Sequence, residues 1–222
     1  MARFRIGPHK GKFSKGGESR MKFLHNLVLV LALGAGSAMA GAAGDLVFAE
    51  RGPWQLDEGG VEWVMTQEGP AVPGFVAVQN GKLLLEQVVD PSDGAPVLQL
   101  SEDSARVTRK IGPFPISAGD PTLVFFLENT SRDMAAITGG SPFYIRNRLK
   151  DALFRGGKVH QEDGFQVAEF TPFADDPNAE RMGMFKDLTL RFYLGDPRQP
   201  ISRMIAQTLV GEPPYRSELV MK

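Results

Sequence analysis

The feature that most constrains the fold is the alternation of short apolar runs with turn residues along the chain. In residues 188–194 (Leu-Thr-Leu-Arg-Phe-Tyr-Leu) an apolar side chain recurs at every second position. This period of two places Leu188, Leu190, Phe192 and Leu194 on one face of an extended strand. Similar runs bounded by Pro and Gly predict further strands at 46–50, 61–66, 75–79, 82–89, 97–100, 105–110, 165–170 and 217–221. Residues 201–210 fit either a strand or a short helix.

One turn signal is specific. Asn80-Gly81 lies between two apolar runs, and both residue types tolerate a positive φ. The pair therefore predicts a two-residue type I′ hairpin that joins the strands at 75–79 and 82–89.

The middle of the chain has a different character. Residues 121–128 include five consecutive apolar residues, which favour a strand buried on both faces. A short helix capped by Thr130 or Ser131 is expected next, ending at Gly139-Gly140. Ser141-Pro142 then gives an N-cap and a proline at the first helical position of a second helix, which runs to about Phe154 before Gly156-Gly157. The core-facing stripe of this second helix consists of Ile145, Leu149, Ala152 and Leu153.

These patterns predict an α+β fold, namely a strand-rich sandwich or partly open barrel with a helix pair inserted at about 130–155. Residues 41–222 are long enough for one well-buried core. We expect a single domain, and the Gly- and Pro-rich stretch at 111–121 is where a subdomain boundary would fall.

Residues 21–40 have the order of a secretory signal peptide. Lys22 precedes an apolar run at 27–33, and small residues follow it up to Ala38-Met39-Ala40. Alanine at positions 38 and 40 fits signal peptidase, so cleavage is expected after Ala40. An uncleaved membrane anchor over 27–43 is the second interpretation. Either interpretation places the body outside the cytoplasm, and we expect a periplasmic protein exported through a Sec-type signal, with Met1 or Met21 as the start.

Charge and cysteine content exclude several classes. Residues 1–40 hold seven of the 25 basic residues and one of the 26 acidic ones, which leaves 18 basic and 25 acidic residues, a formal charge of −7, in the body. This sign argues against nucleic-acid binding, which depends on Lys and Arg at phosphates. The chain has no cysteine, so disulfides, a thiol nucleophile and thiolate metal sites are excluded.

The body offers little catalytic chemistry. Its one histidine, His160, is expected in an exposed loop, and Ser141 reads better as a helix cap than as a nucleophile. The acidic turn at 175–187 imitates a calcium loop, but Arg181 occupies the position where that loop needs glycine. A surface turn capped by Asp176 is the preferred interpretation. No catalytic residue, metal site or cofactor is predicted.

The second helix carries the one concentration of positive charge in the body. The candidate ligand-binding residues are Tyr144, Arg146, Arg148, Lys150 and Arg155. Tyr144, Arg148, Asp151 and Arg155 recur at helical spacing and share a stripe. The stripe could bind an anionic small molecule or a lipid head group, although a solvated helix face is the simpler interpretation.

The function that the sequence favours is an exported, non-enzymatic binding or accessory protein of the bacterial cell envelope. An envelope protein is a further candidate partner. The alternative is a carboxylate-dependent hydrolase that acts on envelope polysaccharide. A purely structural interaction module ranks third. No stable membrane span is expected after cleavage.

Overall fold

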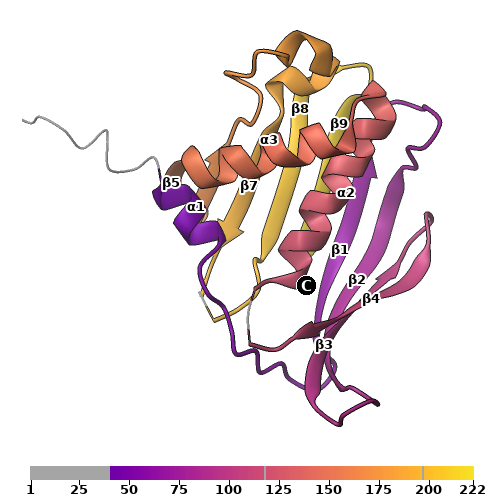
Figure 1. The fold of residues 1–222 in the computed structure, drawn as a ribbon, viewed down its shortest axis with the longest axis vertical. Helices are drawn as coiled ribbons and strands as arrows, with labels where there is room; N and C mark the ends of the chain where they lie inside the picture. The colour runs from indigo at the N-terminus through magenta and orange to yellow at the C-terminus, as the bar shows by residue number, and fades with distance from the viewer. Residues whose placement is uncertain (1–40, 118, 197) are drawn as a thin grey trace, which may run out of the picture. The chain divides into compact units, whose positions relative to one another are not determined.

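A computed structural model of the protein describes residues 41–117, 119–196 and 198–222. The described residues form one nine-stranded antiparallel sheet in the order β4-β3-β2-β1-β9-β8-β7-β6-β5, accompanied by helices (Figure 1). The predicted signal peptide and the residues before it lie outside the described part. The elements are α1 (Ala42–Val47), β1 (Val61–Glu68), β2 (Val78–Val89), β3 (Pro96–Asp103), β4 (Thr108–Pro115), α2 (Pro121–Thr138), α3 (Pro142–Arg155), β5 (Lys158–Glu162), β6 (Phe165–Phe170), η1 (Ala179–Asp187), β7 (Thr189–Leu194), β8 (Arg203–Gly211) and β9 (Pro214–Met221).

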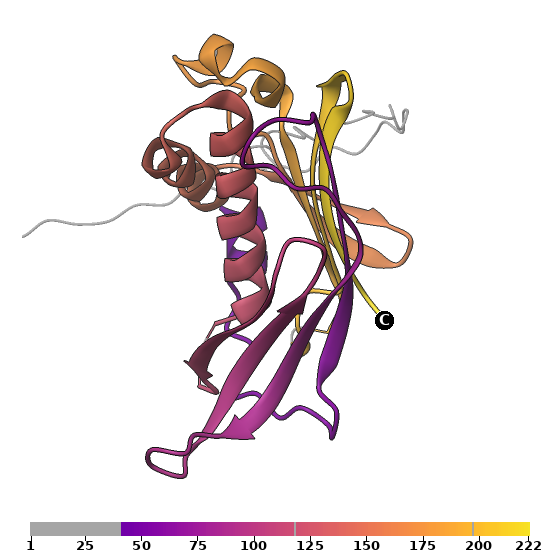
Figure 2. The ribbon, with the colours of Figure 1, turned by 90° about the vertical axis from the view of Figure 1, so that its right-hand side faces the viewer.

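The sheet consists of two meanders that meet at its centre. Strands β1 to β4 form the first and β5 to β9 the second, and β1 pairs with β9 in antiparallel register from Trp63↔Met221 to Glu68↔Arg216. Helices α2 and α3 connect the meanders and lie on one side of the sheet (Figure 2). The predicted α+β class with helices inserted between strands is confirmed. The sheet is single and open, so the fold has one sheet layer covered by helices, not the two sheets of a sandwich.

The prediction of a strand at 121–128 is wrong, because these residues form the first part of helix α2. Asp120 caps the helix, since its carboxylate accepts hydrogen bonds from the N–H groups of Thr122 and Leu123 at 2.9 and 3.3 Å. Pro121 at the first helical position supports this start. The apolar run fits a helix because the buried face is broad: within 123–127 only Val124 is exposed. Thr130 and Ser131, the predicted caps, therefore lie in the middle of the helix.

Two further predictions, both for residues before β3, are wrong. Residues 46–50 were expected to be a strand, but Ala43 and Val47, one turn apart on α1, are fully buried against the core. Asn80-Gly81 does not form a hairpin, because β2 runs through it. Only Asn80 has a positive φ (54°), and the register shifts between Met65 and Gln67 opposite it, which describes a β-bulge.

The type I′-compatible turn lies elsewhere, at Asp163-Gly164, where φ is 50° and 83°. It joins β5 to β6, so His160 lies on an edge strand and not in the expected loop. The ambiguous residues 201–210 belong mostly to strand β8. The stripe predicted in β7 is confirmed, because Leu188, Leu190, Phe192 and Leu194 are all buried.

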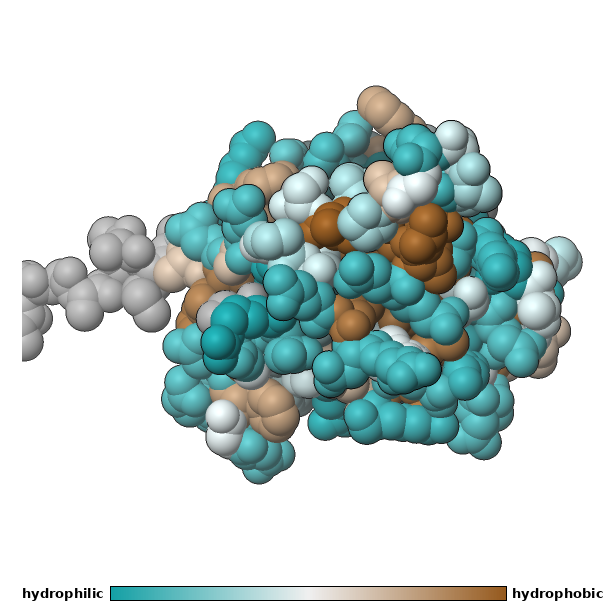
Figure 3. Space-filling model, turned by 90° about the horizontal axis from the view of Figure 1, so that it is seen from below, coloured by the Kyte–Doolittle hydropathy of each residue, from teal (hydrophilic) through white to brown (hydrophobic). Residues whose placement is uncertain are grey.

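The core lies between the sheet and the helices. Phe126 of α2 meets Phe192 of β7 edge to face at 6.0 Å between ring centroids, and Phe170 contacts the same ring at 5.9 Å. Ion pairs occupy the opposite face of the sheet. Glu62 pairs with Lys82 and Lys222, and Glu218 pairs with Arg203 of β8 and with Arg216 of its own strand. On the face seen in Figure 3, exposed apolar side chains gather in separate areas bordered by polar ones. Among the described residues no helix combines the length and the apolar character that a membrane crossing needs.

Candidate functional site

Helix α3 forms as the sequence predicts. Ser141 accepts a hydrogen bond from the Tyr144 N–H at 3.5 Å, Pro142 follows, and Gly156 ends the helix. Ile145, Leu149 and Leu153 are buried, as expected of the core stripe, while Ala152 is half-buried. The flanks that remain carry the five candidate side chains. The structure divides four of these between two hollows, and Tyr144 lines neither.

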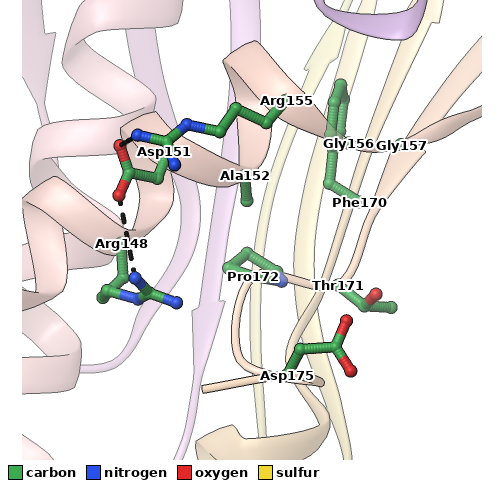
Figure 4. Close-up of a pocket in the computed structure, with 10 residues that line it drawn as sticks. All are labelled: Arg148, Asp151, Ala152, Arg155, Gly156, Gly157, Phe170, Thr171, Pro172 and Asp175. Atoms are coloured by element: carbon green, nitrogen blue, oxygen red, sulfur yellow. Dashed lines mark hydrogen bonds and ion pairs between the residues drawn. The ribbon is translucent and has the colours of Figure 1, made fainter. Parts of the chain in front are cut away.

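The first hollow, called the polar pocket below, lies at the C-terminal half of α3 and measures about 400 Å³. Figure 4 shows α3 side chains on one wall and the segment after β6 on the facing wall. Its lining residues are Arg148, Asp151, Ala152, Arg155, Gly156, Gly157, Phe170, Thr171, Pro172 and Asp175. The stripe of Arg148, Asp151 and Arg155 therefore faces a hollow.

Arg148 is held by a carboxylate that the sequence did not pair with it. Its Nε lies 2.6 Å from Oδ2 of Asp176, whose side chain is fully buried. The other oxygen of Asp176 accepts hydrogen bonds from the Tyr144 hydroxyl at 2.6 Å and from the Asn178 N–H at 2.7 Å. Burial by itself would raise the pKa of Asp176, but the bonds from Tyr144 and Asn178, together with Arg148, outweigh it and hold the pKa below its usual value.

This cluster, the Asp176 hub, joins α3 to the acidic turn. The predicted Asx-type cap is confirmed by the bond from the Asn178 N–H. Within the described residues, no group of three or more potential metal ligands gathers at this turn or elsewhere. Tyr144 and Arg148 thus connect α3 to the acidic turn through Asp176. The sequence analysis interpreted both residues as ligand contacts and did not predict this connection.

The charges of the polar pocket largely cancel. Arg148 and Arg155 face it together with Asp151 and Asp175. Asp151 also lies 3.7 Å from Arg148 and 3.4 Å from Arg155, and the Asp176 hub already neutralises Arg148. Arg155 alone keeps a highly exposed guanidinium, with 79% of its side chain accessible. The pocket therefore offers hydrogen-bond donors and acceptors but no surplus of positive charge.

The second hollow, called the apolar groove below, lies among α1, α2 and α3 and measures about 340 Å³. Arg146 and Lys150 belong to this groove and not to the polar pocket. Arg146 forms two bonds to Glu128, at 2.6 and 2.8 Å, and this pairing raises the pKa of Arg146 above its usual value. The lining residues are Phe48, Val124, Leu127, Glu128, Ser131, Arg146, Leu149, Lys150 and Phe154.

A second polar cluster, distinct from the Asp176 hub, lies between α2 and the sheet. The buried carboxylate of Asp133 accepts hydrogen bonds from Tyr215 at 3.1 Å, Gln67 at 3.3 Å and Arg106 at 3.2 Å. Burial raises the pKa of Asp133 to about 6, although Arg106 and Tyr215 act in the opposite direction. Sequence reasoning missed this cluster because its members come from four separate elements or loops, and no local pattern connects them.

Two further residues considered in the sequence analysis, Ser141 and His160, lie outside both hollows. Ser141 caps α3, as expected. His160 lies 3.4 Å from Glu162 on the outer face of the sheet. In comparisons with known proteins, no family model, no curated protein and no solved structure matched the chain.

Proposed function

We propose that the protein is an exported, non-enzymatic binding or accessory protein of the bacterial cell envelope, and that it binds a small ligand on the flanks of α3. The proposal of export to the periplasm rests on the order of charged, apolar and small residues at 21–40. The proposal of binding rests on the two hollows that flank helix α3.

One observation carries the binding proposal. Helix α3 has a hollow on each flank, of about 400 and 340 Å³, and both lie within the range of roughly 300–1,000 Å³ typical of small-molecule sites. Four of the five candidate side chains line these hollows, Arg148 and Arg155 on one side and Arg146 and Lys150 on the other. The opposite face of the sheet, by contrast, carries cross-strand ion pairs.

The ligand classes follow from the two linings. A small anionic molecule could meet the accessible guanidinium of Arg155, and a lipid head group could meet Lys150. The Asp176 hub does not contact the ligand in this proposal; it fixes Arg148 and the end of the acidic turn that borders the polar pocket.

The proposal can be tested by calorimetric titration of the purified protein with four probes: inorganic phosphate, glucuronate, glycerol 3-phosphate and dodecanoate. At least one should bind with 1:1 stoichiometry. Arg155→Gln or Lys150→Gln should weaken that binding, while Lys186→Gln, a change of an exposed lysine away from both hollows, should not. Absence of binding by all four probes would contradict the proposal.

A hydrolase acting on envelope polysaccharide is the second candidate, and one observation favours it. Asp151 and Asp175 lie on different walls of the polar pocket, on α3 and on the segment after β6, as a pair of catalytic carboxylates would (Figure 4). Release of reducing ends from envelope glycan fragments, lost in both Asp151→Asn and Asp175→Asn, would establish the enzyme and overturn the binding proposal.

A further inference from the structure

The walls of the apolar groove are aromatic and aliphatic. Phe48 and Phe154 stack at 4.8 Å with their rings almost parallel, although 40% and 60% of these residues is exposed. Val124 is 53% exposed on the α2 wall, and Leu127 and Leu149 complete the apolar part of the lining. Exposed apolar side chains that line a concave surface mark a site where a bound ligand would remove apolar surface from water.

A buried hydroxyl in the same groove lacks a partner. Ser131 is 1% exposed, and its Oγ has no hydrogen-bond partner among the described residues. A serine in a helix can usually bond the carbonyl one turn before it, and a buried hydroxyl without a bond is costly. An occupant that carries an acceptor oxygen would satisfy this hydroxyl.

The charge of the groove favours an anion. Glu128 is neutralised by its two bonds to Arg146. Lys150 lines the groove and forms no ion pair within the described part of the chain. One uncompensated ammonium therefore lies beside an apolar hollow, and its four-carbon stem can cover apolar surface while the charge stays in water.

From these three observations we infer that the apolar groove binds a single-chain anionic amphiphile of the fatty-acid type. The acyl chain lies against Phe48, Val124 and Phe154, and the carboxylate takes hydrogen bonds from Lys150 and Ser131. The inference rests on the proposed function, because it names the ligand class for one flank of α3.

Other occupants fit the groove less well. Attraction to an anionic membrane surface depends on clusters of several basic residues, whereas the lining of the groove holds two, Arg146 and Lys150, and Arg146 is paired with Glu128. A stable interface with a second copy takes roughly 20–30 residues of each partner, whereas nine residues line the groove. A single chain with one charged end matches both the volume and the ammonium of Lys150.

Dodecanoate is the probe. It would be titrated by calorimetry, below its micellar concentration, into the purified mature protein. Wild type should bind one equivalent. Val124→Trp should abolish binding by filling the groove, whereas Leu209→Trp, a control on another exposed aliphatic residue at the β8–β9 hairpin, should not.

Two polar variants test the head-group contacts. Lys150→Gln should weaken dodecanoate binding about tenfold, and Lys186→Gln, at a lysine that lines neither hollow, should leave it unchanged. Ser131→Ala should weaken binding several-fold while leaving the free protein as stable as wild type or more so, because it removes an unpaired buried hydroxyl. Loss of stability in Ser131→Ala would show that the hydroxyl is bonded in the free protein.

The outcomes separate this inference from the proposed function. If dodecanoate does not bind but phosphate, glycerol 3-phosphate or glucuronate does, in a manner lost in Arg155→Gln, the inference fails and the proposed function stands. If no probe binds, both fail. Dodecanoate binding that survives Val124→Trp would overturn the groove assignment. Binding to phosphatidylglycerol vesicles without binding of free dodecanoate, or dimerisation lost in Val124→Trp, would assign the groove to a membrane or a second copy and overturn the inference.

Discussion

Replacement of Arg148 by glutamine tests whether the Asp176 hub fixes α3 against the acidic turn. The change removes the guanidinium whose Nε lies 2.6 Å from Oδ2 of Asp176, and it keeps the helix propensity of the position. The carboxylate then stays in a fully buried position without its cation. Its other oxygen still accepts bonds from Tyr144 and Asn178.

The expected loss of folding stability in Arg148→Gln follows from the burial of Arg148 and Asp176. Removal of one partner from a fully buried pair costs about 3–5 kcal/mol, because the other charge is left uncompensated. Here Arg148 keeps 31% of its side chain exposed, and Asp176 retains two hydrogen bonds, so we expect a loss of about 2 kcal/mol. Arg155→Gln, whose side chain is 79% exposed, should cost under about 0.5 kcal/mol.

Urea denaturation followed by circular dichroism would measure both variants at pH 7. A double-mutant cycle with Asp176→Asn would isolate the coupling between the two side chains. The pKa of Asp176 lies below its usual value in the folded state, so its stabilisation is present above the unfolded-state pKa, near 3.8, and is lost as the pH falls through the folded value. Equal stability of Arg148→Gln and Arg155→Gln would refute the structural role of Arg148.

The remaining predictions concern the buried carboxylate, one glycine and export. Because the folded pKa of Asp133 is about 6 against an unfolded value of 3.8, its contribution is fully present below pH 3.8 and is lost as the pH rises through 6. The wild type should therefore lose up to about 3 kcal/mol relative to Asp133→Asn between pH 4 and pH 7, and parallel stability curves would contradict this. Gly157→Ala should cost about 2–4 kcal/mol in urea denaturation, since φ is +96° and a Cβ would lie 2.5 Å from the Phe170 ring, whereas Gly164→Ala meets no atom within 4 Å and should cost about 1 kcal/mol; equal losses would refute the clash. N-terminal sequencing of protein recovered from the periplasmic fraction should begin at Gly41, and full-length chain recovered only from membranes would favour the anchor.

Elements with both ends encoded locally were predictable from the sequence. Helix α3 has Ser141 and Pro142 at its start and Gly156 at its end, and its core stripe is periodic. The alternation of apolar and other side chains in β7 could likewise be predicted without knowing which strands pair with it. The strand predicted at 121–128 failed because periodicity alone does not distinguish a broadly buried helix from a buried strand, and Asp120-Pro121, a cap followed by a helix-starting proline, was the overlooked signal.

The candidate site was predictable only as a region. Spacing along α3 placed Arg148 and Arg155 on one stripe, and both line the same pocket. That Arg148 would be neutralised depends on Asp176, which is far away in sequence and reaches α3 through the fold. That Lys150 would border an apolar groove depends on Phe48 of the segment after α1, which was predicted to be a strand. Neither contact leaves a pattern in a single sequence.

The central claim, that the flanks of α3 form the ligand-binding face, is tested most directly by mapping ligand-induced chemical-shift changes on the backbone amides of the purified protein. Dodecanoate and glucuronate would be titrated separately. Saturable changes should be confined to α1, α2, α3 and residues 171–175, with the dodecanoate changes centred on Val124, Ser131, Lys150 and Phe154. Changes centred instead on the outer face of the sheet, around Arg203 and Glu218, or no saturable change with either ligand, would contradict it.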